Sequence, residues 1–486
     1  MKKILTIITV LILTATLVAC GESGDGGGGG GTQQIELTYA DWANQELNQQ
    51  LIDAFMEAHP DIRVILRTDI TGSGDAFTGN LVTAAQAGLL PDVFATDNVP
   101  TVVNAGLTLD VAQYWDQDAD SQLVYDNIAA TGVYDGKRFA LPSFQFLKGI
   151  MINLDIFEDA NLTTVEGEYR IDNDGYPVKD WTFEEFVNIA SAIKDFDPND
   201  YQSGYVLGLD TWYGTPDFQQ VWPMMDDATV GYDTFDGEQF NYSTSDSWKD
   251  ALTAKIEMHA LTDGTTTRFD AEFLEANSDL AIYHIQNGTA AMDIEGSWQF
   301  WVLNDAKENG INLGFWPYPQ GSAGFFPPTI LDYLAVSSET EFPEEAFKLA
   351  KWMSFGKAGY SARLDILEAN NALAEANGEY PTYLDRFPIA DYPDVWDRVG
   401  GFVSDIEGID YILDNIENAK PDLDKWLPGY KDFWSWVFDP ENPYNFDALV
   451  VAGASSVPTW ATEWERKINE IVQTALETLG QPPVEE

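Results

Sequence analysis

Segments with strand and helix patterning alternate between residues 35 and 97, and this order restricts the fold more than any other feature of the sequence. Two short segments alternate between apolar and polar residues, as strands do, and residues 91–97 hold a third short strand. Two segments between the strands carry apolar residues three and four positions apart, as helices do. Strands that alternate with helices form a parallel sheet with helical crossovers. The expected segments are strand 35–40, helix 47–56, strand 62–66, helix 77–87 and strand 91–97.

Polar and aromatic residues follow two of these strands. Trp42, Asn44 and Gln45 come directly after the first strand, and Asp97 ends the third. The carboxyl ends of parallel strands lie at one edge of a sheet, where such sheets bind ligands. The sequence therefore predicts that these four side chains border one crevice.

Residues 1–20 are typical of a bacterial lipoprotein signal peptide. Two lysines precede an uncharged apolar stretch that is shorter than the about 20 residues needed to span a membrane. The stretch ends in Leu-Val-Ala followed by Cys20, a lipobox that predicts lipid modification of Cys20. Because Cys20 is the only cysteine, no disulfide and no cysteine metal or redox site can form within the chain. The alternative is a plain secretory signal with a chance cysteine.

Residues 21–33 predict a flexible tether. They include six consecutive glycines, and a chain this rich in glycine cannot bury a core. We therefore expect the folded protein to begin near Gln33.

The composition limits the classes of partner. The chain has 80 acidic and 25 basic residues, a net charge of −55, which argues against nucleic acid and anionic lipid headgroups. With 45% hydrophobic and 13% aromatic residues, however, the chain is not an acidic disordered protein. Its length favours two lobes or domains.

Several motifs occur in a characteristic order. Residues 55–64 fit Phe-x-x-x-x-Pro-x-Ile-x-Val, residues 91–94 are Pro-Asp-Val-Phe, and residues 134–142 end in Phe-Ala-Leu-Pro after a Tyr-Asp-Gly-Lys turn. Residues 288–298 join Gly-Thr-Ala-Ala-Met to Glu-Gly-Ser-Trp, and residues 343–347 are Pro-Glu-Glu-Ala-Phe. In this order the motifs resemble family 1 extracellular solute-binding proteins, the sugar-binding subunits of ABC importers, which include maltose-binding proteins.

The resemblance implies an α/β, two-lobed periplasmic-binding-protein-like fold of type II, with a hinge of about three chain crossings and a ligand cleft between the lobes. On this basis we expect lobe 1 to comprise residues 34–142 and 288–338, and lobe 2 residues 143–287 and 339–486. Motif matches end near residue 360, beyond which the sequence predicts only helices.

The resemblance also implies a function. The protein is expected to capture a carbohydrate, in particular an oligosaccharide, and deliver it to the permease subunits of an ABC importer. Oligopeptides and polyols stay open as ligands. We expect a monomer without a cofactor, held by its lipid anchor at the extracellular face of the cell membrane, or facing the periplasm if the host has two membranes.

A sugar presents hydroxyl groups around an apolar ring face, so its site needs aromatic side chains together with carboxylates and amides. Such residues occur at the expected strand ends and in the segments that resemble the cleft of the family, although each taken alone also suits the core or the surface. The candidate ligand-binding residues are Trp42, Asn44, Gln45, Asp97, Trp212, Tyr213, Glu295, Trp298 and Phe325.

Two other classes of function were weighed. A glycoside hydrolase would need paired carboxylates, and Asp293 with Glu295 point the same way on a strand, but close acidic pairs are common in so acidic a chain. A surface adhesin would bind no small sugar. The three histidines lack metal-ligand spacing, and the acidic turn 172–175 predicts a hairpin or an incomplete Ca²⁺ loop. We therefore expect a binding protein, with neither catalysis nor a metal site.

Overall fold

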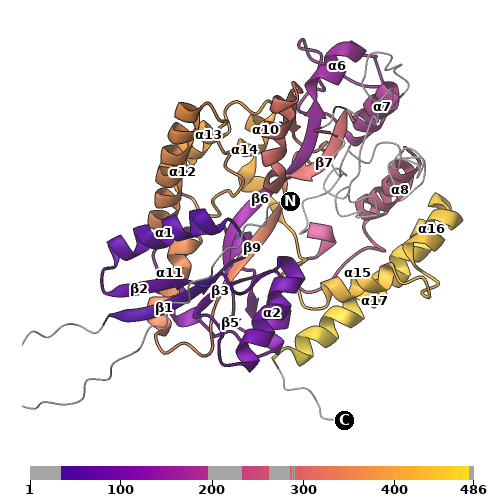
Figure 1. Ribbon diagram of the computed structural model, residues 1–486. Helices are drawn as coiled ribbons and strands as arrows, with labels where there is room; N and C mark the ends of the chain where they lie inside the picture. Colours follow the sequence, from indigo (N-terminus) through magenta and orange to yellow (C-terminus); the bar gives the residue numbers. More distant parts are fainter. Residues whose placement is uncertain (1–33, 195–231, 262–284, 287, 289, 481–486) are drawn as a thin grey trace, which may run out of the picture.

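The computed structural model describes residues 34–194, 232–261, 285–286, 288 and 290–480. Its first part confirms the predicted order of strands and helices. β1 (Ile35–Ala40) lies between β2 (Ile62–Leu66) and β3 (Val93–Thr96) and runs parallel to both. α1 (Gln45–Ala58) and α2 (Gly74–Gln86) form the crossovers between these strands (Figure 1). The carboxyl ends of β1 and β3 therefore meet at one edge of the sheet, as expected.

One long strand connects the two parts of the molecule. β6 (Leu141–Asn153) pairs antiparallel along 141–147 with β9 (Pro328–Val336), which in turn pairs with β3. Along 148–153, β6 pairs instead with β7 (Met292–Gly296) and β8 (Leu313–Trp316). All residues of β6 are buried. In Figure 1, β6 rises through the centre of the molecule from the β1–β3 part toward α6 at the top.

The chain passes between these two parts at several places. It leaves the β1–β3 part along β6 and returns between β8 and β9. α11 (Pro343–Met353) then packs on β3 and β9, and α12 (Lys357–Asn377) packs on α1. The chain crosses again to α14, which packs on β8, and comes back to β10, which pairs with β9.

The strand pairings bear on the expected lobe boundaries. β7 pairs with the later half of β6, which favours a place for 292–296 in the second lobe. The contacts of α11 with β3 and β9 favour a place for 343–353 in the first lobe. The predicted boundaries instead assign residues 292–296 to lobe 1 and residues 343–353 to lobe 2. The division into lobes stays a prediction, and these two segments are where it is weakest.

Helices of the last third complete the molecule. α15 and α17 pack on each other, and α8 packs on α17, so that these helices form a separate group at the right of Figure 1. No helix in the described ranges combines the length and the apolar character that a membrane crossing requires. The remaining elements are α3 (Val99–Asn104), α4 (Ala112–Trp115), α5 (Asp126–Ala129), β4 (Val133–Tyr134), β5 (Lys137–Arg138), α6 (Leu154–Ala160), α7 (Phe183–Lys194), α8 (Asp246–Leu261), α10 (Trp301–Glu308), α13 (Pro393–Phe402), α14 (Ile409–Leu413), β10 (Lys420–Pro421), α15 (Tyr430–Val437), α16 (Phe446–Ala452) and α17 (Val457–Thr478).

Local sequence signals explain several of these elements. Asp135 and Gly136, both with positive φ, form the tight turn between β4 and β5. Thr182 and Glu185 form the predicted capping box of α7, with each side chain accepting a hydrogen bond from the backbone N–H of the other. The acidic turn 172–175 is closed by a bridge between Ile171 and Pro177, the hairpin alternative.

Candidate functional site

The loop after β1 carries three predicted site residues that differ in their surroundings. The Trp42 ring is half-buried and meets Phe77 of α2 edge to face, with 5.3 Å between ring centroids. Asn44 caps α1, since its side chain accepts a hydrogen bond from the backbone N–H of Leu47 at 3.1 Å. Gln45 donates from Nε2 to the carbonyl oxygen of Asp41 at 2.6 Å, while its buried Oε1 has no hydrogen-bond partner in the described chain. Asn44 thus has a structural role, whereas Gln45 keeps one acceptor available.

Asp97, at the end of β3, is held between two lysines. Its carboxylate lies 3.2 Å from Nζ of Lys425 and 3.3 Å from Nζ of Lys431. Lys425 also contacts Asp332 of β9 at 2.6 Å. Although burial lowers the pKa of Lys425, the carboxylates of Asp332 and Asp97 outweigh it and raise the pKa above its usual value. The predicted crevice residue Asp97 therefore belongs to a chain of alternating charges that extends from β3 to β9.

A buried acid lies next to the row of charges that Lys431, Asp97, Lys425 and Asp332 form. Asp422, which directly follows β10, is 5% exposed, and its carboxylate accepts a weak hydrogen bond from the backbone N–H of Leu331 at 3.4 Å. Burial, reinforced by repulsion from Asp424, raises the pKa of Asp422 to about 7. This carboxyl group is therefore partly protonated near neutral pH.

Trp298 lies on the second half of the sheet, after β7. Its ring meets Phe146 of β6 edge to face at 5.9 Å. A Cβ atom on Gly296 would lie 2.1 Å from the Trp298 ring, so only glycine allows the ring to cover the strand end. The predicted Gly-x-Trp combination is thus a packing requirement.

Glu295 does not share this side of the sheet. It pairs with Gly149, and successive residues of a strand face opposite sides, so its side chain faces away from that of Lys148 and from the Gly296 position covered by Trp298. The carboxylate is buried at 2% exposure. Strand register therefore separates Glu295 from Trp298, although they are three residues apart.

The other candidates are less informative. Phe325 is buried and packs on Tyr411 at 5.4 Å between ring centroids. Trp212 and Tyr213 lie outside the described residues. The structure thus brings Trp42, Gln45 and Asp97 to one edge of the sheet, and places Trp298 across β6 from them.

Sequence reasoning missed two arginines at this edge. Cζ of Arg363, on α12, lies 4.5 Å from the ring centroid of Phe144, and Cζ of Arg386 lies 5.7 Å from the same centroid. Arg386 also lies over Phe146 at 5.5 Å, on the ring that contacts Trp298. For Arg363 a signal existed, because it interrupts the apolar stripe formed by Tyr360, Leu364 and Leu367 on the buried face of α12. Arg386 stands in a loop, where no pattern marks it.

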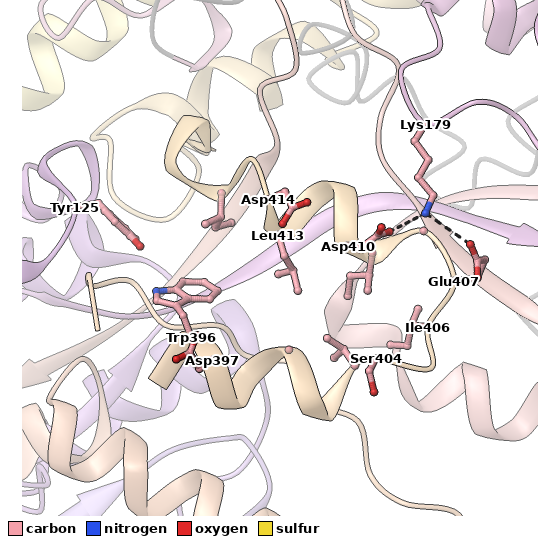
Figure 2. A pocket seen from close by; sticks show the side chains of 15 residues that line it. Tyr125, Lys179, Trp396, Asp397, Ser404, Ile406, Glu407, Asp410, Leu413 and Asp414 are labelled. Carbon is pink, nitrogen blue, oxygen red and sulfur yellow. Dashed lines mark hydrogen bonds and ion pairs between the residues drawn. The ribbon is translucent and has the colours of Figure 1, made fainter. Parts of the chain in front are cut away.

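A separate cavity lies away from these residues, between α13 and α14. It has a volume of about 690 Å³ and an apolar floor that includes Val403, Ile406 and Ile409. Figure 2 shows Trp396 and Asp397 on one side, Leu413 and Asp414 opposite, and Lys179 joined to Asp410 and Glu407. None of the predicted ligand-binding residues lines this cavity.

Comparison with known proteins defines the class. Helices and strands of similar arrangement occur in several solved binding proteins. An ABC substrate-binding protein from Listeria monocytogenes in complex with cycloalternan has a TM-score of 0.60 at 19% identity, over 90% of this chain and 98% of that chain. A cyclic alpha-maltosyl-1,6-maltose binding protein from Arthrobacter globiformis has a TM-score of 0.60 at 18% identity, over 90% of this chain and 99% of that chain. The sugar-binding protein MalE from Xanthomonas citri has a TM-score of 0.59 at 17% identity, over 92% of this chain and 100% of that chain.

These similarities establish the two-lobed periplasmic-binding-protein fold. The sequence model for the bacterial extracellular solute-binding protein family matches residues 40–357, and the chain belongs to that family. The expected family and fold class are thus confirmed. No curated protein sequence matches the chain. The matched segment includes Trp42, Asp97 and Trp298, and it ends before Arg363 and Arg386.

Proposed function

We propose that the protein captures a carbohydrate, in particular an oligosaccharide, and delivers it to the permease subunits of an ABC importer. Membership of the solute-binding family supports solute capture. The solved neighbours named above are a protein in complex with cycloalternan, a cyclic alpha-maltosyl-1,6-maltose binding protein and a sugar-binding protein. The observation that carries the choice of carbohydrate is the side-chain set at the sheet edge. Trp42 lies at the same edge of the sheet as the carboxylate of Asp97, and the Trp298 ring contacts Phe146, over which the guanidinium group of Arg386 lies. Aromatic rings with charged hydrogen-bonding groups are the combination that a sugar needs.

Ligand would bind between the two lobes and stabilise their closed arrangement, which shifts the population that docks on the permease. The protein performs no catalysis in this scheme; the family and the solved neighbours are binding proteins. Lipid attachment at Cys20, with residues 21–33 as the tether, would hold a monomer at the outer face of the membrane.

The test is a thermal shift screen of the purified full chain against mono- and oligosaccharides, confirmed by calorimetry. A ligand at a hundredfold excess over Kd stabilises by about 2.7 kcal/mol, which the melting temperature reports clearly. We expect one class of oligosaccharide to bind, and Trp298→Ala to abolish the shift. A folded protein that responds to no sugar would contradict the proposal. Cys20→Ala should release the protein from the membrane fraction without changing sugar binding.

A further inference from the structure

Two guanidinium groups at the sheet edge have no ion pair and no side-chain hydrogen bond within the described part of the chain. Arg363 is 4% exposed, and the Nε atom of Arg386 is buried without a partner. Both groups lie against the Phe144 ring. Burial, followed by repulsion from Arg386, lowers the pKa of Arg363. A buried charge without partners is costly, so this arrangement needs an explanation.

A shortage of acidic residues does not explain why the two arginines lack ion pairs, because the chain has 80 acidic residues. Arg398, on the molecular surface, contacts Asp365 at 2.7 Å and Glu368 at 2.9 Å. The two arginines at the sheet edge instead stack on aromatic rings, which leaves their N–H groups available for another partner. The backbone holds Arg386 in this place: Phe387 exchanges hydrogen bonds with Gln145 of β6, and the carbonyl of Arg386 accepts from Tyr360.

Carboxylates surround Arg386 without reaching it. Burial lowers the pKa of Arg386, but Asp385, Asp332 and Asp41 outweigh it and raise the pKa above its usual value. None of the three is within ion-pair distance of either arginine in the described residues. Asp41 accepts from the Tyr39 hydroxyl at 2.9 Å, and Asp332 is paired with Lys425. Opposite charges are thus close enough to attract each other and still separated by a gap.

The charges of this group balance. Arg363, Arg386, Lys425 and Lys431 are positive, and Asp41, Asp332, Asp385 and Asp97 are negative. A hydroxyl group suits such a gap, because its oxygen accepts from a guanidinium N–H while its O–H donates to a carboxylate. The unpartnered Gln45 Oε1, next to Asp41, offers a further acceptor for a hydroxyl. An acidic or amino sugar would instead add a charge with no counter-charge.

From this arrangement we infer that Arg386 is a ligand-binding residue, and that the site selects an uncharged polyhydroxyl ligand whose hydroxyl groups bridge Arg386 to the carboxylates of Asp332 and Asp385. The inference rests on the proposed function. Arg386 and Asp385 lie beyond the segment that the family model matches, so family membership does not assign them.

The first experiment compares three series of di- to hexasaccharides on the full chain: neutral glucose oligosaccharides, oligogalacturonates, which are anionic, and chitosan oligosaccharides, which are cationic. Calorimetry at fixed ionic strength gives Kd. We expect binding in the neutral series and at least tenfold weaker binding in both charged series. Tightest binding by a charged series would overturn the inference and leave carbohydrate capture intact. Silence in all three series would overturn the proposed function, and the inference with it.

The second experiment alters the residues. Arg386→Gln should weaken the best neutral ligand about 10- to 100-fold, the range for lost hydrogen bonds to a charged group. It also leaves the group with an excess negative charge, so the affinity ratio of chitosan to neutral oligosaccharide should rise. Asp385→Asn should raise the corresponding ratio for oligogalacturonate. A purely structural arginine would not produce these opposite shifts.

Arg398→Gln, which removes a surface arginine, is the matched control and should leave Kd unchanged. The melting temperature of each ligand-free variant separates folding from binding, and Arg386→Lys keeps the charge if Arg386→Gln does not fold. An Arg386 variant that folds and binds the neutral ligand as tightly as the unaltered protein would overturn the assignment of Arg386.

Discussion

The row of charges at the sheet edge and the cavity between α13 and α14 are built in opposite ways. The cavity is an open space of about 690 Å³, with aliphatic side chains beneath exposed acids and one lysine that is already paired twice. The sheet edge holds charged groups of both signs: Lys425 is paired with Asp332, whereas Arg363 and Arg386 lie against the Phe144 ring. Open volume alone does not define a binding site; fixed polar groups that lack partners do.

Lys425 should contribute most to the stability of the row. Lys425→Met removes the ion-pair partner of the buried Asp332 and one of the two lysine partners of Asp97, leaving the Asp332 carboxylate uncompensated. The expected loss is about 3–5 kcal/mol in the free energy of unfolding, measured with urea. Lys348→Met, which breaks an exposed pair with Glu344 at 2.8 Å, should change it by less than about 1 kcal/mol. Equal effects would show that the row is not a stabilising unit.

Asp422 should make stability depend on pH. Its pKa is raised from 3.8 to about 7 on folding, so the native state holds a proton that the unfolded state releases between these values. This contribution is fully present below about pH 4 and is lost as pH rises toward 7, a decrease of at most about 4 kcal/mol. Urea unfolding at several pH values measures this decrease. Asp422→Asn should remove this part of the slope of the free energy of unfolding against pH. An unchanged slope in the variant would contradict the assignment.

Much of the fold follows from the sequence because local and long-range signals agree. Alternating strands and helices predicted the β1–β3 sheet, and Asp135-Gly136 and Thr182 marked a turn and a helix start. A local signal also explains where β6 ends: the Asn153 side chain accepts from the backbone N–H of Ile156 and begins α6.

The site was less predictable, for a physical reason. Strand ends identified Trp42 and Asp97, because topology places them. Sequence proximity suggested that Glu295 and Trp298 act together, yet strand register turns them to opposite faces. Arg386 was missed because its place depends on contacts with β6, some 240 residues earlier in the chain. Such long-range contacts leave no local pattern.

Gly296 offers a smaller test of the sheet edge. Gly296→Ala places a Cβ 2.1 Å from the Trp298 ring, so the ring must move away from Phe146. We expect about a tenfold loss of sugar affinity by calorimetry, with modest destabilisation, since the displaced group is one side chain. The control is Gly401→Ala in α13, where a Cβ meets no atom within 4 Å. There, affinity should not change and stability should rise by about 0.5–1 kcal/mol.

The smallest expected effect on binding is at the cavity, and it is the most direct test of the comparison. Trp396 is half-buried there, and its Nε1 donates to the carbonyl oxygen of Ala390 at 3.1 Å. Trp396→Leu should lower stability by about 1–3 kcal/mol through lost packing and one lost hydrogen bond. Its effect on the Kd of the sugar should stay below twofold, because none of the residues proposed to bind the sugar lines the cavity. If Trp396→Leu instead weakened the sugar more than tenfold while Arg386→Gln did not, the open cavity would be the site and the balanced charges of the sheet edge a structural feature.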